Sequence, residues 1–143
     1  MKKIVYLLAV SALLLLGSCS DRIVPVGQLP EAAKTFLEQY FPGIAISYIK
    51  KDSDLLKTTY EVRLDSGAEI DFDSKGEWDK VDCKRQSVPA ALVPAAINTY
   101  IDSNFPGQFV VKIDKELFGY EVELANDLEL KFTKDGRLVG VDD

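Results

Sequence analysis

The chain of 143 residues contains no histidine and has only two cysteines, one methionine and one tryptophan. Without histidine it cannot build a Ser-His-Asp triad or a zinc site with histidine ligands. Two cysteines are too few for the disulfide-dense scaffold of a small secreted domain. With 47% hydrophobic and 28% charged residues, the composition also excludes a disordered or collagen-like chain. The sequence therefore predicts one ordinary folded domain.

Long hydrophobic runs are absent except at the N-terminus. There, Lys2 and Lys3 precede an apolar run over residues 4–16 that only Ser11 interrupts. This run is shorter than the roughly 20 residues that cross a bilayer as a helix. Basic residues, a short apolar run and then small residues are typical of a secretory signal. We interpret residues 1–18 as a signal peptide and expect the mature protein outside the cytoplasm.

Two processing routes remain open at Cys19. The segment Leu16-Gly17-Ser18-Cys19 resembles a bacterial lipobox, in which Cys19 carries a lipid and residues 19–27 form a tether. Alternatively, Ser18-Cys19-Ser20 is a site for ordinary cleavage before Asp21. We favour the lipoprotein, with its lipid as the only membrane contact and a location in the periplasm or at the outer membrane.

The other cysteine, Cys83, has no partner for an internal disulfide once Cys19 is lipidated or removed. The sequence also offers no histidine base and no second thiol to activate it. We interpret Cys83 as a small buried apolar residue and not as a reactive thiol.

The charge balance is acidic. The chain has 17 basic and 23 acidic residues and a formal net charge of −6, which becomes −8 when the two lysines of the signal peptide are removed. Nucleic acid and anionic lipid head groups repel a protein of this charge. We therefore expect no nucleic-acid partner, and a protein or peptide partner that is basic or uncharged.

An internal repeat organises the mature chain. Residues 29–43 match residues 93–107 with six identities in fifteen positions, and residues 60–82 match residues 120–142 with nine identities in twenty-three. The offset between the copies falls from 64 to 60 residues, so four residues are missing from the second copy. We place this loss near residues 51–56, a polar stretch that is typical of a hairpin loop.

Each copy begins with a helix pattern and continues with strand patterns. Pro30 and Pro94 suit a first helical turn, and apolar residues at helical spacing follow each of them. The Pro-Gly pairs at 42–43 and 106–107 end these helices. Alternating residues then predict strands, including one with Ile44, Ile46 and Tyr48 on one face, and Gly76 and Gly136 predict hairpin turns.

One copy exposes too much apolar surface to be stable alone, whereas two copies can share one core. We predict an α+β fold in which two helix-plus-four-strand repeats, residues 28–83 and 93–143, form one antiparallel sheet of about eight strands. Both helices pack on one face of this sheet, and residues 84–92 connect the repeats.

These residues resemble the PepSY-like family of periplasmic proteins, also called β-lactamase-inhibitor-like, which is common in Bacteroidetes. The resemblance lies in residues 26–43, in Gly76-Glu77-Trp78-Asp79-Lys80-Val81-Asp82-Cys83, and in residues 94–107. It implies two helix-plus-four-strand repeats, as in a secreted protein inhibitor of β-lactamase. It supplies no catalytic residues and no inhibitory contact, because a shared fold does not carry a binding site with it.

The segment from Asp71 to Asp82 superficially resembles a calcium-binding loop. Its fifth position is Lys75, where a ligand oxygen is needed, and its last position is Asp instead of the bidentate Glu. The second copy keeps only the glycine of this motif. We therefore interpret the segment as a hairpin and predict no metal site and no cofactor.

The same hairpin suggests an acidic patch. If Asp73 faces Glu77, then Phe72 faces Trp78 and Asp71 faces Asp79, which gathers Asp71, Asp73, Glu77 and Asp79 on the solvent side of the sheet. Trp78 and Val81 share a face only if a bulge lies near Asp79 or Lys80. The second copy has Lys131, Thr133, Arg137 and Val139 at the four patch positions, so the patch belongs to the first copy alone. It is either a site for a basic partner or a charged strand face that keeps the protein soluble.

We expect a non-enzymatic exported protein that binds a protein or peptide through the open sheet face. Catalysis by paired carboxylates needs a dry cleft, which nothing in the sequence supplies. The alternative is a small-ligand carrier or small enzyme with a pocket between the helices and the sheet. A structural envelope protein, with neither pocket nor coherent charged patch, is a third possibility.

Overall fold

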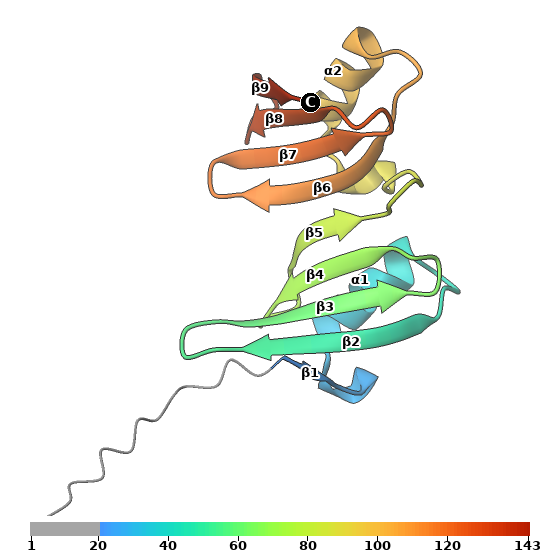
Figure 1. Cartoon of the computed structure of the whole chain (residues 1–143), viewed down its shortest axis with the longest axis vertical. Helices are drawn as coiled ribbons and strands as arrows, with labels where there is room; N and C mark the ends of the chain where they lie inside the picture. The colour runs from blue at the N-terminus through green and yellow to red at the C-terminus, as the bar shows by residue number, and fades with distance from the viewer. Residues whose placement is uncertain (1–20) are drawn as a thin grey trace, which may run out of the picture.

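The computed structural model describes residues 21–143, so the predicted signal peptide and Cys19 lie outside the described residues. These residues form one antiparallel sheet of nine strands in which each strand pairs with the next along the chain, from β1 to β9. Figure 1 shows the helices α1 and α2 behind the same face of this sheet. The predicted α+β fold is confirmed, and the ninth strand, β1 (Arg22–Ile23), is an addition.

The two repeats contain the same elements in the same order. In the first repeat they are α1 (Glu31–Tyr40), β2 (Ile46–Ser53), β3 (Thr58–Leu64), β4 (Glu69–Asp73) and β5 (Trp78–Asp82). In the second repeat they are α2 (Ala95–Asn104), β6 (Val110–Glu116), β7 (Gly119–Leu124), β8 (Glu129–Thr133) and β9 (Leu138–Asp142). A short 3-10 helix precedes each α-helix, at Val26–Gln28 and Ala90–Leu92. Pro30 and Pro94 immediately precede the two α-helices, as predicted.

The repeats share one hydrophobic core between the helices and the sheet. In the first repeat the ring of Phe36 on α1 lies edge-on to Phe72 on β4, with centroids 5.4 Å apart. In the second repeat Tyr100 and Phe132 make the equivalent contact at 5.5 Å. The pairing of β5 with β6, in which Val81 lies opposite Ile113, joins the two halves of the sheet and makes the core continuous.

The N-terminal edge of the sheet differs from the prediction, because residues 22–24 belong to the fold and not to a tether. Ile23 lies opposite Lys50 of β2, and the backbone N–H of Val24 donates a hydrogen bond to the carbonyl of Ile49 at 2.9 Å. Val24 is buried in the core. This short strand covers the edge of β2 in the way that β5 covers β6.

The prediction of which β2 side chains face the core is wrong after Ile46. A bulge between Ile46 and Tyr48 turns Tyr48 to the open face, where it pairs with Arg63, and places Ile49 in the core. A one-residue shift exchanges the two faces of a strand, so the regular alternation assumed from Ile44 onward could not hold through the bulge.

The bulge predicted in the last strand of the first repeat is confirmed. Phe72 pairs with Trp78, Asp71 pairs with Lys80, and the register shift between these pairs leaves Asp79 as the extra residue. The bulge allows Trp78 to pack against the core and Val81 to be buried within it. The four missing residues of the second repeat lie in the equivalent hairpin: its loop covers residues 117–118 where the first repeat has 54–57, and β6 and β7 are each one residue shorter than β2 and β3.

Candidate binding surface

The open face of the sheet, which the helices do not cover, is lined by charged side chains. Residues in β2 to β9 that alternate with the buried core positions point to this face. Carboxylates outnumber cations there. The carboxylates are Asp52, Glu61, Glu69, Asp71, Asp82, Asp114, Glu121, Glu123, Glu129 and Asp142, and the cations are Lys50, Arg63, Lys80, Lys112 and Lys131.

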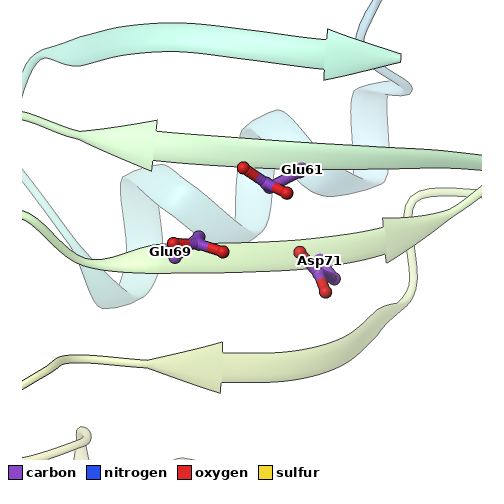
Figure 2. Close-up of side chains that lie close together, drawn as sticks. All are labelled: Glu61, Glu69 and Asp71. Carbon is purple, nitrogen blue, oxygen red and sulfur yellow. The ribbon is translucent and has the colours of Figure 1, made fainter. Parts of the chain in front are cut away.

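Three of these carboxylates meet in the first repeat. Figure 2 shows Glu61 on one strand and Glu69 and Asp71 on the next. One carboxylate oxygen from each lies within 4.8 Å of the other two. Burial raises the pKa of Asp71 above its ordinary value, and the negative charges of Glu61 and Glu69 act in the same direction while Lys80 opposes them.

Cations from β3, β5 and the turn after β5 surround this group. Arg63 of β3 forms an ion pair with Glu69, and the ammonium nitrogen of Lys84 lies 3.2 Å from the same carboxylate. Lys80 of β5 lies 3.7 Å from Asp71 and 4.0 Å from Glu69. The acidic group is thus part of a cross-strand charge network, in which Glu69 already has several cationic partners.

The structure divides the predicted acidic patch. Asp71 faces Lys80 and not Asp79, because the bulge adds one residue to β5. Asp73 caps its own turn, since its Oδ1 atom accepts hydrogen bonds from the backbone N–H groups of Lys75 at 2.8 Å and Glu77 at 3.0 Å. The turn is the hairpin predicted in place of a calcium loop.

Glu77 and Asp79 lie near a cation that the sequence did not reveal. The ammonium nitrogen of Lys115, on β6, lies 3.9 Å from the centre of the Trp78 ring. Burial lowers the pKa of Lys115, and the charges of Asp79, Glu77 and Asp73 oppose this change. The predicted patch therefore consists of Asp71 within the charge network and three other carboxylates near Lys115.

A hollow of about 260 Å³ connects the two groups across the middle of the open face. Its lining comes from β2 to β6 and from the loop after β2. The lining residues are Lys50, Asp52, Lys57, Thr59, Tyr60, Glu61, Asp71, Asp79, Lys80, Asp114 and Lys115. Asp71 and Asp79 are the two predicted site residues in it. Glu61 was visible in the sequence as a polar strand residue, but only the register of β3 against β4 places it beside Asp71.

Two further grooves lie beside the helices, where the sequence predicts the alternative pocket. One, of about 210 Å³, is lined mainly by apolar residues of the first repeat, including Leu37, Phe41 and Ile44. The other, of about 360 Å³, occupies the equivalent place in the second repeat and contains Gln108 where the first has Ile44. Neither groove gathers several acidic groups as the open face does.

Within residues 21–143 no helix has the length and apolar character needed to cross a bilayer.

Comparisons with known proteins agree with the repeat architecture. The family model described as "Putative beta-lactamase-inhibitor-like, PepSY-like" matches residues 17–65 and again residues 57–140. Among proteins with curated functions, none matches the chain.

Solved structures from Bacteroides are similar over nearly the whole chain. A putative periplasmic protein from Bacteroides vulgatus is 39% identical, with a TM-score of 0.83 over 87% of this chain and 100% of its own. A putative calcium-regulated periplasmic protein from Bacteroides thetaiotaomicron is 41% identical, with a TM-score of 0.82 over 86% and 97% of the two chains. A second putative periplasmic protein from Bacteroides vulgatus, of the DUF2874 family, is 35% identical, with a TM-score of 0.82 over 87% and 98% of the two chains. The chain therefore belongs to the PepSY-like, β-lactamase-inhibitor-like family.

Proposed function

We propose that the protein is an exported, non-enzymatic binding module whose open sheet face holds a basic segment of a protein or peptide. The observation that carries this proposal is the excess of carboxylates over cations on the uncovered face, where a hollow of about 260 Å³ is lined by five carboxylates and four lysines. The other face is occupied by the helices and the core. A partner with alternating lysine or arginine side chains is complementary to this surface in charge.

The side chains at the hollow favour binding over catalysis. Catalysis by two carboxylates needs one with a raised pKa in a site that excludes water. Burial does raise the pKa of Asp71, but its side chain remains 35% exposed and lies beside Lys80. A face in which each acid has solvent or a cation as partner is suited to exchange those cations for ones supplied by a ligand.

The test is the binding of a fluorescent peptide of alternating lysine and threonine to the full mature chain at low salt. Neutralising the predicted patch by D71N/D73N/E77Q/D79N is expected to weaken binding at least about tenfold, because close cation–carboxylate pairs are lost. The matched control E31Q/E38Q/D102N/D135N removes the same charge from exposed sites away from the open face and leaves binding within about twofold. Equal weakening by both sets contradicts the proposal, since net charge alone then explains the binding.

Calcium is the competing ligand for this face. A structural neighbour is described as calcium-regulated, and Glu61, Glu69 and Asp71 bring hard oxygen ligands together. The cations on Glu69 would have to be displaced, which favours the basic partner. Isothermal titration with calcium alone distinguishes the two ligands. Calcium binding that E61Q abolishes, without peptide binding by the unmodified chain, replaces our proposal with a calcium site.

We further propose that Cys19 carries a lipid and holds the domain at an envelope membrane. The Leu16-Gly17-Ser18-Cys19 segment supports this proposal, as do the periplasmic descriptions of the structural neighbours. The mass of the mature N-terminus tests it. An acylated N-terminal Cys19 is expected, and a mature chain that begins at Asp21 contradicts it.

A further inference from the structure

The most exposed large hydrophobic side chains of residues 21–143 lie at the ends of two equivalent hairpins. Leu55 and Leu56, between β2 and β3, are 95% and 98% exposed. Leu117 and Phe118, between β6 and β7, are 77% and 82% exposed. We call these two pairs the hairpin tips. Figure 1 shows both loops on the same side of the sheet.

Neither tip requires apolar residues to form its turn. In the first tip the Asp54 carboxylate shapes the loop by accepting hydrogen bonds from the backbone N–H groups of Leu56 and Lys57, both at 2.7 Å. In the second tip Leu117 and Phe118 are the two loop residues of a tight hairpin. Asn, Asp and Gly are favoured at such positions. Turn formation therefore does not explain the apolar side chains. Exposed apolar groups of this kind are typical of a surface that contacts another molecule.

The chain enters the domain toward this same end of the sheet. Arg22 lies opposite Lys51 and Ile23 opposite Lys50, so β1 begins at the end of the sheet that carries the first tip. Cys19 is three residues before Arg22, which corresponds to at most about 10 Å of extended chain. A lipid on Cys19 therefore brings the membrane surface to the end of the molecule that carries the hairpin tips.

We propose that both hairpin tips insert into the lipid surface beside the anchored N-terminus, an inference that rests on the proposed lipidation of Cys19. The tips are four strand spacings apart, or about 19 Å, so they contact the membrane at two separate points. Lys57 lies next to the first tip, where its ammonium group can meet lipid phosphates while the apolar side chains enter the interface. The lipid alone leaves the domain free to rotate. Two inserted tips hold the sheet upright, with its acidic open face accessible from the side.

The test places an environment-sensitive fluorophore at single engineered cysteines in the full lipidated chain. Leu56→Cys and Phe118→Cys report on the tips, and Ser66→Cys, in the turn between β3 and β4, reports on the opposite end of the sheet. The native Cys83 does not compete for label because it is buried and burial raises the pKa of its thiol to about 11. The membrane probe is a vesicle of phosphatidylcholine and phosphatidylethanolamine, whose low surface charge does not repel the acidic domain.

Labels at residues 56 and 118 are expected to show a blue-shifted emission and at least twofold quenching by brominated lipid, whereas the label at residue 66 shows neither. Flotation of the lipidated chain with no change at either tip overturns the insertion and leaves the lipidation intact. A mature chain without lipid overturns both. Shielding of the tip labels by an added envelope extract but not by vesicles also overturns the inference, because the tips then bind protein.

Paired serine variants provide a second measurement that does not depend on labels. L55S/L56S and L117S/F118S each remove one tip from exposed positions that make no core contact, so both variants are expected to fold. Each is expected to increase protease access to the vesicle-bound domain at least threefold, and Val139→Ser, a change at an exposed residue outside the tips, leaves it unchanged. Unaltered protease access in both tip variants contradicts the insertion.

Discussion

The strands β5 and β9 occupy equivalent places in the two repeats but have different surroundings. In the first repeat β6 pairs with the outer side of β5, whereas no described strand follows β9. Val81 on β5 is fully buried, and its equivalent Val141 on β9 is 49% exposed. The same residue type in the same local fold thus belongs to the core in one copy and to the surface in the other. Burial is set by the neighbouring repeat and not by the module itself.

The open face shows a second difference between the copies. In the first repeat Asp71 on β4 faces Lys80 on β5. In the second repeat the place of Asp71 is taken by Lys131, which lies 3.8 Å from Glu121 and pairs with Asp142, while the place of Lys80 is taken by Gly140. Both copies therefore place a lysine among carboxylates, but on different strands. Asp71 and Lys80 line the hollow of about 260 Å³, whereas their equivalents Lys131 and Gly140 do not.

The largest expected effect separates Val81 from Val141. Val81→Asp places an unpaired charge in the centre of the shared core and is expected to lower the free energy of unfolding by more than about 4 kcal/mol. Val141→Asp places the same charge at an exposed edge and is expected to cost less than about 1 kcal/mol. Urea denaturation followed by circular dichroism measures both. Similar losses for the two variants contradict the idea that the second repeat buries β5.

A smaller effect separates Cys83 from its equivalent in the second repeat, the exposed Asp143. The backbone N–H of Cys83 donates a hydrogen bond to the Val111 carbonyl at 2.8 Å, so the second repeat covers this cysteine. With Cys19→Ser leaving one thiol, a disulfide reagent at pH 8 is expected to react with Cys83 at least about a hundredfold more slowly in native protein than in urea. Rapid reaction in the native protein means that the interface between the repeats opens.

The pKa of Cys83 predicts the sign of a related pH effect. Burial raises the pKa of this thiol from 9.0 to about 11, so the unfolded chain releases the thiol proton at a lower pH than the folded chain. Stability from this group is therefore lost as the pH rises from about 9 to about 11. The same denaturation experiment repeated over this range is expected to show the loss in the unmodified chain and not in Cys83→Ala.

Most of the fold was predictable because its signals are local and occur twice. Pro30 and Pro94 mark the helix starts, and the matched pairs Phe72/Phe132 and Gly76/Gly136 mark equivalent strands and turns. The strand β1 was missed because two residues carry no periodic pattern. The phase of β2 was misjudged because its bulge depends on pairing with β3, and a strand's own sequence does not reveal this.

The candidate site was predicted less completely than the fold because it depends on register between strands. Asp71 and Asp79 were identified, and both line the hollow. Their direct opposition was wrong because the bulge that the core requires for Trp78 and Val81 also moves Asp79 out of register. Lys115 comes from the other repeat, and the pairing of β5 with β6 that brings it near Trp78 has no local sequence signal.

A third comparison concerns Trp78 and its equivalent Leu138. The centres of the Trp78 and Phe36 rings are 6.3 Å apart. The ammonium nitrogen of Lys115 lies 3.9 Å from the centre of the Trp78 ring. Trp78→Leu gives the first repeat the residue of the second and is expected to lower the free energy of unfolding by about 1–2 kcal/mol, through lost aromatic burial and lost cation–π attraction. Lys115→Met removes only the cation and is expected to cost less than about 1 kcal/mol. If the two variants lose the same stability in urea, the ring contributes only through the lysine.

The smallest expected effect concerns the pH dependence that Asp71 gives to the first repeat. Because its pKa is raised above the ordinary value of 3.8, the folded chain holds this proton to a higher pH than the unfolded chain does. The group therefore lowers stability as the pH rises above about 4, and the full cost is present once the pH exceeds the folded pKa.

Asp71→Asn removes this dependence. The measured quantity is the free energy of unfolding of Asp71→Asn minus that of the unmodified chain. From pH 4 to pH 7 this difference is expected to rise by less than about 1 kcal/mol, because the Asp71 side chain is 35% exposed and Lys80 offsets part of the cost. Lys131→Asn changes the equivalent position of the second repeat, which holds a cation instead of a carboxylate, and is expected to show no such gain. A loss of stability in Asp71→Asn that grows with pH contradicts the raised pKa and identifies the pairing with Lys80 as the dominant interaction.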